Sequence, residues 1–305
     1  MSDWKILVAD GLGASGLALL DQSALVENKK GITAEELLLK IREYDAIIVR
    51  SRTKITAGVL AAATRLKVVG RAGVGVDNID LSAARERGVT VVNTPESTTI
   101  SVAEHTFSLL LSLARNIPAA DAGMKSGNWL KNSLSGAELY QKTLGIIGIG
   151  RIGNAVAERA GAFRMRVIGY DPYITEEKIR SQGAVPASLE AVYAESDYIT
   201  LHLPLTDETR CMLNEDAFRQ MKPGVRIICA ARGGVIDEAA LLAALETGHV
   251  AGAALDVFAQ EPPGFDPTYR TPQRNRLPTY RRSDRRSANS RSGRCGDRGA
   301  SRAAW

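Results

Sequence analysis

Short aliphatic runs alternate with helical patterns along the first hundred residues. Four runs combine Val, Ile and Leu with polar or glycine ends, as buried strands do, at Lys5–Asp10, Ala46–Ser51, Leu66–Gly73 and Thr90–Asn93. Between them, AEELLLKIREY (34–44) and DLSAARERG (80–88) have the apolar spacing of helices that bury one face. Strands that alternate with helices indicate βαβ units around a parallel sheet covered on both faces.

The alternation resumes after a long apolar segment, SVAEHTFSLLLSLAR (101–115), which we expect to be a helix crossing between two lobes. A glycine-rich stretch then opens a second series, with further strands expected at 197–205, 225–234 and 250–258. The pattern predicts an α/β protein of two lobes with parallel sheets. We assign residues 1–97 to the first lobe, 98–268 to the second, and 269–305 to a tail of different composition.

The tail changes the meaning of the net charge. The 305-residue chain carries +5 at pH 7, but residues 270–305 hold eleven Arg, no Lys and two Asp, a balance of +9. The remaining residues therefore carry −4, so only the tail favours a polyanionic partner, and we expect no nucleic acid to bind. Because Leu277 is the one large aliphatic residue in 270–305, this segment is predicted to be disordered.

Targeting and metal-binding signals are weak. No apolar run approaches the roughly 18 residues needed to span a membrane, and the first residues, MSDWKILVADG, begin a strand rather than a signal peptide. We therefore expect a cytoplasmic protein without a membrane partner. Cys211, Cys229 and Cys295 have no paired spacing, which argues against a disulfide framework and against a metal site.

The stretch LGIIGIGRIG, which begins at Leu144, is typical of a strand-to-helix turn that binds a dinucleotide. Gly148 permits the tight turn, Gly150 lets backbone N–H groups approach a pyrophosphate, and Gly153 lets the helix pack against the sheet. The phosphates would lie at a helix N-terminus, where unpaired N–H groups favour negative charge.

An acid in register strengthens this interpretation. Asp171 ends the next strand, VIGYDPY, eighteen positions after Gly153, about where a carboxylate accepts hydrogen bonds from the ribose hydroxyls. No Arg stands beside Asp171, and its charge would repel a 2′-phosphate. The sequence therefore predicts NAD rather than NADP.

Three polar residues follow predicted strands of the second lobe, at the edge where parallel sheets bind ligands. Arg232 could hold a substrate carboxylate bidentately and polarise the adjacent carbonyl. Glu261, stiffened by Pro262 and Pro263, could orient a catalytic histidine, and Asp256 ends the same strand. The alternative is that Arg232 and Glu261 are ordinary solvated loop charges.

The first lobe offers a second polar edge. Arg50, Ser51 and Arg52 close one predicted strand, and the glycine-rich turn that contains Gly73 closes the next. Two guanidinium groups, a hydroxyl and backbone N–H groups are suited to a phosphate or carboxylate, although solvated turn charges would look the same. His105 lies on the apolar helix, where a core or hinge histidine is the favoured interpretation.

From Lys5 to Pro263 the chain resembles the D-2-hydroxyacid dehydrogenase family, most closely its members that oxidise 3-phosphoglycerate. The segments that carry the resemblance include VRSRTKIT, VVGRAGVGVDNID, VNTPESTT, AEHTFSLLLSLARNIPAAD, LGIIGIGRIG, ITLHLPLTDETR, CAARGGVIDEAAL and AGAALDVFAQEPP. The resemblance implies a flavodoxin-like substrate lobe, a Rossmann domain for NAD, and a homodimer or homotetramer joined through the NAD domains.

The resemblance also implies roles for single residues. Arg232 would be the substrate-binding catalytic arginine, and Glu261 the acid paired with the catalytic histidine. The substrate would be held by Arg50, Ser51, Arg52 and Gly73. The NAD site would be lined by Val74, Gly148, Gly150, Arg151, Ile152, Gly153, Asp171, Leu203, Ala230 and Asp256. No metal is implied.

The chain departs from the family after Glu261. The family's general base is a histidine about eighteen residues further on, where this chain has Thr279, and no histidine follows. Residues 273–290 can be written with codons whose shifted frame spells a family-like NAIVCPHIGAQTVEAQI. We therefore hypothesise a frameshift between about Gly264 and Gln273, with an Arg-rich arm that binds polyanions as the competing interpretation.

These observations leave three functions open. The first is NAD-dependent oxidation of 3-phosphoglycerate to 3-phosphohydroxypyruvate, the entry step of serine biosynthesis, impaired by loss of the histidine. The second is turnover of another 2-hydroxy acid, as by a glyoxylate or hydroxypyruvate reductase. The third is a catalytically silent NAD-binding protein.

Overall fold

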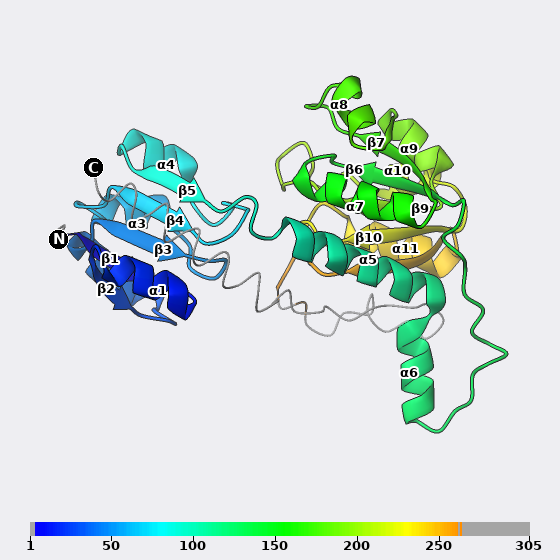
Figure 1. Ribbon diagram of the computed structural model, residues 1–305, viewed down its shortest axis with the longest axis horizontal. Coiled ribbons are helices and arrows are strands. Elements are labelled where there is room, and N and C mark those ends of the chain that lie inside the picture. The colour runs from blue at the N-terminus through cyan, green and yellow to red at the C-terminus, as the bar shows by residue number, and fades with distance from the viewer. Residues whose placement is uncertain (1–3, 262, 264–305) are drawn as a thin grey trace. The chain divides into compact units, whose positions relative to one another are not determined.

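The computed structural model describes residues 4–261 and 263. These residues form two compact units that meet between Thr99 and Ile100. Unit 1 comprises residues 4–99, and unit 2 comprises residues 100–261 with 263 (Figure 1).

Unit 1 contains a five-stranded parallel sheet with the order β2-β1-β3-β4-β5. Its strands are β1 (Lys5–Val8), β2 (Leu25–Asn28), β3 (Ala46–Val49), β4 (Val68–Arg71) and β5 (Thr90–Asn93). This is the flavodoxin-like order, in which the chain changes direction of winding between β1 and β3. The predicted flavodoxin-like lobe is confirmed.

Helices cover both faces of the sheet in unit 1. They are α1 (Ala14–Asp21), α2 (Ala34–Lys40), α3 (Ala57–Ala62) and α4 (Leu81–Glu86), with a 3₁₀ turn at Ile41–Glu43. Because side chains alternate along a strand, Leu7 and Ile47 pack with α2, α3 and α4, whereas Ile6 and Ile48 pack with Leu20 of α1.

Unit 2 contains a six-stranded parallel sheet with the order β11-β10-β9-β6-β7-β8. Its strands are β6 (Thr143–Ile147), β7 (Arg166–Tyr170), β8 (Val185–Pro186), β9 (Tyr198–Leu201), β10 (Val225–Cys229) and β11 (Val250–Leu255). Numbered within the unit, this is the doubly wound Rossmann order, with its switch point between β6 and β9.

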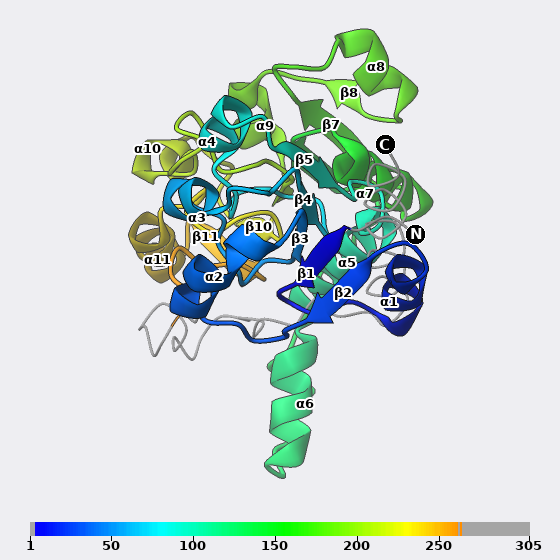
Figure 2. The same ribbon diagram turned by 90° about the vertical axis from the view of Figure 1, so that its left-hand side faces the viewer.

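The helices of unit 2 are α5 (Thr99–Arg115), α6 (Ile117–Lys125), α7 (Arg151–Ala162), α8 (Glu176–Ser181), α9 (Leu189–Glu195), α10 (Glu215–Gln220) and α11 (Glu238–Thr247). Buried side chains of α5 and α7 form one core with one face of the sheet, and those of α9, α10 and α11 form a second core with the other face. Figures 1 and 2 show α6 continuing beyond α5, away from the sheet of its unit.

The predicted α/β fold with parallel sheets is confirmed, and several elements differ in extent. The strand predicted at Lys5–Asp10 ends at Val8, and that at Ala46–Ser51 ends at Val49, because beyond these residues the Asp10 side chain bonds to the backbone of a turn at 50–53. β2, β8 and α6 were not predicted, since their apolar runs are short or exposed. The expectations for the tail at 269–305, for Thr279 and for the frameshift lie outside the described residues.

No helix at 4–261 is both long and apolar enough to cross a membrane. Within that same stretch, no group of three or more His, Cys, Asp or Glu side chains is arranged to hold a metal ion.

Candidate dinucleotide site and anion-binding turn

The glycine turn between β6 and α7 is shaped by its missing side chains. Gly148 has a φ of 94°, in the left-handed region, and a Cβ there would lie 2.7 Å from the carbonyl oxygen of His202. At Gly153 a Cβ would lie 2.1 Å from the carbonyl oxygen of Gly148. A Cβ at Gly150 would meet no described atom within 4 Å. Packing thus requires glycine at 148 and 153, whereas the space at Gly150 is open to a ligand.

The first turn of α7 has the features of an anion-binding helix N-terminus. Gly150 is the N-cap residue, and no side chain of the described residues caps this end of the twelve-residue helix. The exposed Arg151 and the half-buried Ile152 follow at the first helical positions. Their N–H groups have no carbonyl partner within the helix, so they and the macrodipole favour a phosphate at this position.

Asp171 directly follows β7 and is oriented by two backbone groups. Its Oδ2 accepts a hydrogen bond from the N–H of Ile149 at 3.0 Å, and its Oδ1 accepts one from the N–H of Tyr173 at 3.0 Å. A carboxylate has about four acceptor positions, so each oxygen can still accept a ribose hydroxyl. Because Ile149 lies in the glycine turn, the carboxylate is held at a set distance from the phosphate end of the site.

The ends of β9 and β10 border the same turn. The N–H of His202 donates to the carbonyl oxygen of Ile147 at 2.8 Å, which brings the segment after β9 alongside the glycine turn. The half-buried Leu203 has its Cδ2 3.0 Å from the position of a Cβ on Gly148. Ala230, which directly follows β10, is 1% exposed. These positions agree with a nucleotide lying across the carboxyl ends of β6, β9 and β10.

Arg232 and Glu261 lie on turns that are packed together. A Cβ on Gly233 would lie 1.8 Å from the carbonyl oxygen of Phe258, so the turn after β10 touches the turn after β11. The Arg232 Nη1 donates to the carbonyl oxygen of Ala231 at 2.7 Å. The Glu261 Oε1 accepts from the N–H of Phe258 at 3.2 Å. Pairing of β10 with β11 thus brings the two segments together, 29 residues apart in the sequence.

Asp256, which follows β11, faces a histidine. Its Oδ1 lies 3.3 Å from Nε2 of His105 on α5, and the two side chains are 7% and 16% exposed. The sequence interpretation of His105 as a core or hinge residue missed this contact. Helical periodicity indicates that His105 lies near the sheet, but it carries no information on which strand end it meets.

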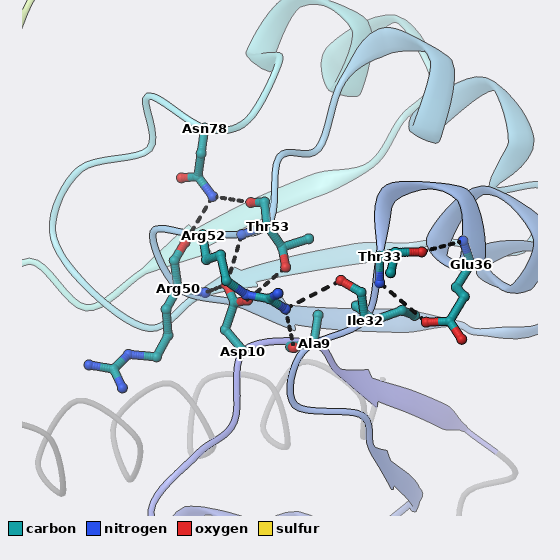
Figure 3. A network of polar contacts seen from close by, with 9 residues as sticks. All are labelled: Ala9, Asp10, Ile32, Thr33, Glu36, Arg50, Arg52, Thr53 and Asn78. Carbon is teal, nitrogen blue, oxygen red and sulfur yellow. Dashed lines mark hydrogen bonds and ion pairs between the residues drawn. The ribbon is translucent and has the colours of Figure 1, made fainter. Parts of the chain in front are cut away.

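The predicted anion seat of unit 1 is the turn after β3, and a buried carboxylate organises it (Figure 3). The Asp10 side chain is 4% exposed. Its Oδ2 accepts from the N–H groups of Arg50 at 2.7 Å and Thr53 at 3.1 Å, and its Oδ1 accepts from the Thr53 hydroxyl at 2.7 Å. Burial alone would raise the pKa of Asp10, but the hydrogen bonds from Thr53, Arg50 and Arg52 outweigh it and lower that pKa below its ordinary value.

The two arginines of this turn differ in their contacts. The Arg52 Nε donates to Asp10 Oδ1 at 3.2 Å, and its Nη2 donates to the carbonyl oxygens of Ala9 at 3.4 Å and Ile32 at 3.3 Å. The Arg50 guanidinium forms no hydrogen bond or ion pair with residues 4–261, and Figure 3 shows it directed away from Asp10. Ser51 lies between them and is exposed.

The turn after β4 lies beside the turn after β3, because Val49 pairs with Arg71. Gly73 is buried and has a φ of 157°, which residues with a side chain rarely adopt, and a Cβ on it would also require the Arg71 guanidinium to move. The half-buried Val74 has its carbonyl oxygen bonded to Nδ2 of Asn93 at 2.6 Å. The four predicted unit 1 substrate residues therefore occupy two adjacent turns at the carboxyl edge of one sheet.

The family assignment rests on the second unit. Residues 107–278 match the family described as D-isomer specific 2-hydroxyacid dehydrogenase, NAD binding domain, and this is more than half of the chain. The chain belongs to the D-isomer-specific 2-hydroxyacid dehydrogenase family. Unit 2 of this family member is therefore an NAD-binding domain, in agreement with the open glycine turn and the oriented carboxylate of Asp171.

Relatives and solved structures of this dehydrogenase family agree with both units. The chain is 50% identical over 262 residues to D-3-phosphoglycerate dehydrogenase of Bacillus subtilis, covering 85% of this chain and 49% of the relative. A glyoxylate reductase from Paecilomyes thermophila superposes with a TM-score of 0.91 at 27% identity, covering 99% and 96%. D-Lactate dehydrogenase from Aquifex aeolicus, complexed with NAD and lactic acid, gives a TM-score of 0.84 at 29% identity, covering 96% and 94%.

The chain spans about half the length of the curated relatives it matches. Sequence reasoning found the family and its motifs, but it missed Asp10 and Asn78 as neighbours of the candidate anion-binding turn at 50–53. A signal for Asp10 was present, since the predicted strand Lys5–Asp10 ends in this acid, and the carboxyl ends of parallel strands form the ligand edge.

Proposed function

We propose that the protein catalyses the NAD-dependent oxidation of 3-phosphoglycerate to 3-phosphohydroxypyruvate, the entry step of serine biosynthesis. The observation that carries this proposal is the Arg50 guanidinium at the switch point of unit 1, which has no hydrogen bond or ion pair with residues 4–261. The chain is also 50% identical to a relative named D-3-phosphoglycerate dehydrogenase. An anionic group distant from the reacting carbon needs a cation of this kind, whereas an NAD-binding domain alone does not.

The residues of the NAD-binding domain would divide the work of binding. The first turn of α7 would hold the pyrophosphate, and Asp171 the adenosine ribose. When bound, NAD supplies the group that accepts a hydride from C2 of the substrate. Arg232 would bind the substrate carboxylate and stabilise charge at the adjacent oxygen. Glu261 would orient a histidine that takes up the proton.

We assign the substrate contacts to the first lobe, residues 1–97, and the NAD contacts to the second lobe, residues 98–268. Arg50, Ser51, Arg52 and Gly73 form the proposed substrate set, with Val74 near the nicotinamide. Turnover of this chain would be impaired, because Thr279 occupies the position expected for the general base, and such a loss lowers rates about 10²–10⁴-fold.

The decisive experiment separates binding from turnover. NADH binding is measured by fluorescence titration, and oxidation of 3-phosphoglycerate is then compared with reduction of glyoxylate and hydroxypyruvate. Turnover of 3-phosphoglycerate supports the proposal, even at a rate about 10³-fold below that of ordinary dehydrogenases. An Arg232→Ala variant, which should retain NADH binding, is the control that any residual rate belongs to this site.

Two other outcomes would reassign the function. Turnover restricted to glyoxylate or hydroxypyruvate would favour the second candidate, which is supported by the similarity to a glyoxylate reductase. NADH binding with no turnover of any acid would favour a catalytically silent NAD-binding protein, which the lack of a histidine after His249 supports.

We further propose a homodimer or homotetramer joined through the NAD-binding domain. The support is an apolar surface on α6 and the segment after it, where Ile117, Met124 and Trp129 are 50%, 59% and 76% exposed. Beside them lies a groove of about 580 Å³ lined in part by Leu130 and Leu134. Sedimentation should give a mass of two or four chains, and Trp129→Ser should shift it toward one.

A cytoplasmic location, with small 2-hydroxy acids as partners rather than nucleic acid or membrane, completes the proposal. It is supported by the metabolic relatives and by the net charge of −4 outside residues 270–305. Fractionation of cells that express the protein would test the location.

A further inference from the structure

One side chain fixes both ends of the turn that would meet the substrate anion. Asp10 is the residue next but one after β1, and the turn at 50–53 follows β3, so the two lie on either side of the switch point of unit 1. Three of the hydrogen bonds that Asp10 accepts come from Arg50 and Thr53, the first and last residues of the turn.

A second side chain closes the turn from the carbonyl side. The Asn78 Nδ2 donates to the carbonyl oxygens of Arg50 at 2.8 Å and Thr53 at 2.6 Å. Asp10 thus accepts hydrogen bonds from the backbone N–H groups of Arg50 and Thr53, and Asn78 donates hydrogen bonds to their carbonyl oxygens. The N–H of Ser51 donates to no acceptor among residues 4–261, so it remains available at the outer side of the turn.

The Asp10 carboxylate also decides which arginine can meet an anion. Arg52 has its guanidinium held by Asp10 and by the carbonyl oxygens of Ala9, just after β1, and Ile32, just before α2. Its charge is balanced by a carboxylate that is 4% exposed, so little attraction is left for a second anion. Arg50 has no such partner within the described part of the chain.

We propose that Asp10 is a positioning residue that presents Arg50 and the Ser51 N–H to the anionic end of the substrate, while Arg52 is a latch on Asp10 and not a substrate ligand. The identity of the anion, the phosphate of 3-phosphoglycerate, rests on the proposed function. Holding the turn before the substrate arrives removes the ordering entropy that binding would otherwise have to overcome. The proposal therefore revises the expectation that Arg50 and Arg52 act alike.

The same sheet supplies a matched control at its opposite end. Asp45 precedes β3 and its side chain is 7% exposed, close to the 4% of Asp10. It accepts from the N–H of Lys5 at 3.1 Å and from Nη2 of Arg65 at 3.1 Å. Arg65 and Arg52 are also alike, at 56% and 54% exposed. Substitutions at Asp45 and Arg65 thus repeat the chemical change without touching the turn.

The experiment measures the Kd of 3-phosphoglycerate by calorimetry at saturating NADH. Loss of a charged hydrogen-bonding group should weaken binding about 30-fold in Arg50→Ala, and loss of positioning about 10-fold in Asp10→Asn. Arg52→Ala should change the Kd by less than about 3-fold, and Asp45→Asn and Arg65→Ala by less than about 2-fold. The Kd of NADH should be unchanged in all variants.

Non-additivity distinguishes positioning from general stability. If Asp10 acts through Arg50, the variant that combines Asp10→Asn with Arg50→Ala should bind 3-phosphoglycerate no more than about 2-fold more weakly than Arg50→Ala alone. An Arg52→Ala effect as large as that of Arg50→Ala would overturn the proposal, as would effects of Asp10→Asn and Arg50→Ala that add in full. If Asp10→Asn fails to fold, Thr53→Val takes its place in the experiment, because it removes the hydrogen bond from the Thr53 hydroxyl to Asp10.

The proposed function can fail without obscuring this test. If the protein binds hydroxypyruvate or glyoxylate rather than 3-phosphoglycerate, the same ratios are measured with that acid. If no acid binds, hydrogen exchange decides: Asp10→Asn should speed exchange of the Arg50 and Thr53 amides at least about 10-fold, and Asp45→Asn should not. Equal exchange in the two variants rejects the role of Asp10.

Discussion

At the switch point of unit 2, glycines without side chains shape the candidate ligand surface. At the switch point of unit 1, side chains that hydrogen-bond to the backbone of a turn shape it. Gly148, Gly150 and Gly153 clear the start of α7 so that backbone N–H groups face outward. In unit 1, Asp10 and Asn78 bind the backbone of a turn so that one arginine is presented. Two parallel sheets thus form their candidate anion sites in different ways.

The difference predicts where each site is vulnerable. A surface built on glycine fails when a side chain is added, because the space is already occupied by backbone. A surface built on hydrogen bonds fails when an acceptor is removed, because the turn loses its anchor. An added side chain should therefore be most damaging at the glycine turn of unit 2, and loss of a charged acceptor most damaging at the turn of unit 1.

The largest effect is expected from Gly153→Ala in α7. Its Cβ would lie 2.1 Å from the carbonyl oxygen of Gly148, so the helix must move away from the turn. We expect a loss of about 3 kcal/mol in the free energy of unfolding of unit 2 and no measurable NADH binding. The control is Gly161→Ala in the same helix, where a Cβ meets no described atom within 4 Å. That variant should be more stable by about 0.5–1 kcal/mol and bind NADH normally.

The next effect is expected from Asp171→Ala. Loss of the carboxylate should weaken NADH about 30-fold, roughly 2 kcal/mol. NADPH should weaken less, because it loses only the support that Asp171 gives the phosphate turn through the N–H of Ile149. Fluorescence titration with both nucleotides measures the ratio. Asp121→Ala on α6, an exposed acid, is the matched removal of a negative charge and should leave both affinities unchanged. Equal weakening of NADH and NADPH would contradict the assignment of the ribose site.

Acid should act on unit 1 through Asp10. Its folded pKa is below the unfolded value of 3.8, so the carboxylate stabilises the fold in full above that value. This contribution is lost as the pH falls through the folded pKa. Asp10→Asn should therefore be less stable by about 2 kcal/mol at pH 7 and should show a smaller decrease in stability below about pH 4. Urea unfolding at pH 7, 4 and 3 measures this, and parallel curves for the two proteins would refute it.

The smallest effects test whether the units differ in anything besides their ligand edges. Thr33 caps α2 in unit 1, and Thr175 caps α8 in unit 2, each through a hydroxyl that accepts a backbone N–H. Replacing either by Ala should lower stability by about 1 kcal/mol. Neither variant should alter ligand affinity. A clear difference between them in urea unfolding would show that the comparison extends beyond the two ligand edges.

The sequence was sufficient to predict the glycine turn at 148–153, but not the hydrogen bonds that hold the turn at 50–53. The roles of Gly148 and Gly153 follow from local chain geometry, which a motif records, and the structure agrees at both positions. The separate duties of Arg50 and Arg52 depend on Asp10, forty residues earlier, and on which strands are neighbours. His105 and Asp256 were missed as a pair for the same reason, since a contact across a sheet leaves no spacing in the sequence.

The hydrogen bond from the N–H of Ile149 to Asp171 has a consequence for cofactor engineering. Exchanging the acid for a small neutral residue, the usual first step toward accepting a 2′-phosphate, would also release the backbone that shapes the phosphate turn. A redesign toward NADP therefore needs a replacement acceptor for that N–H, such as an asparagine oxygen, before any arginine is added.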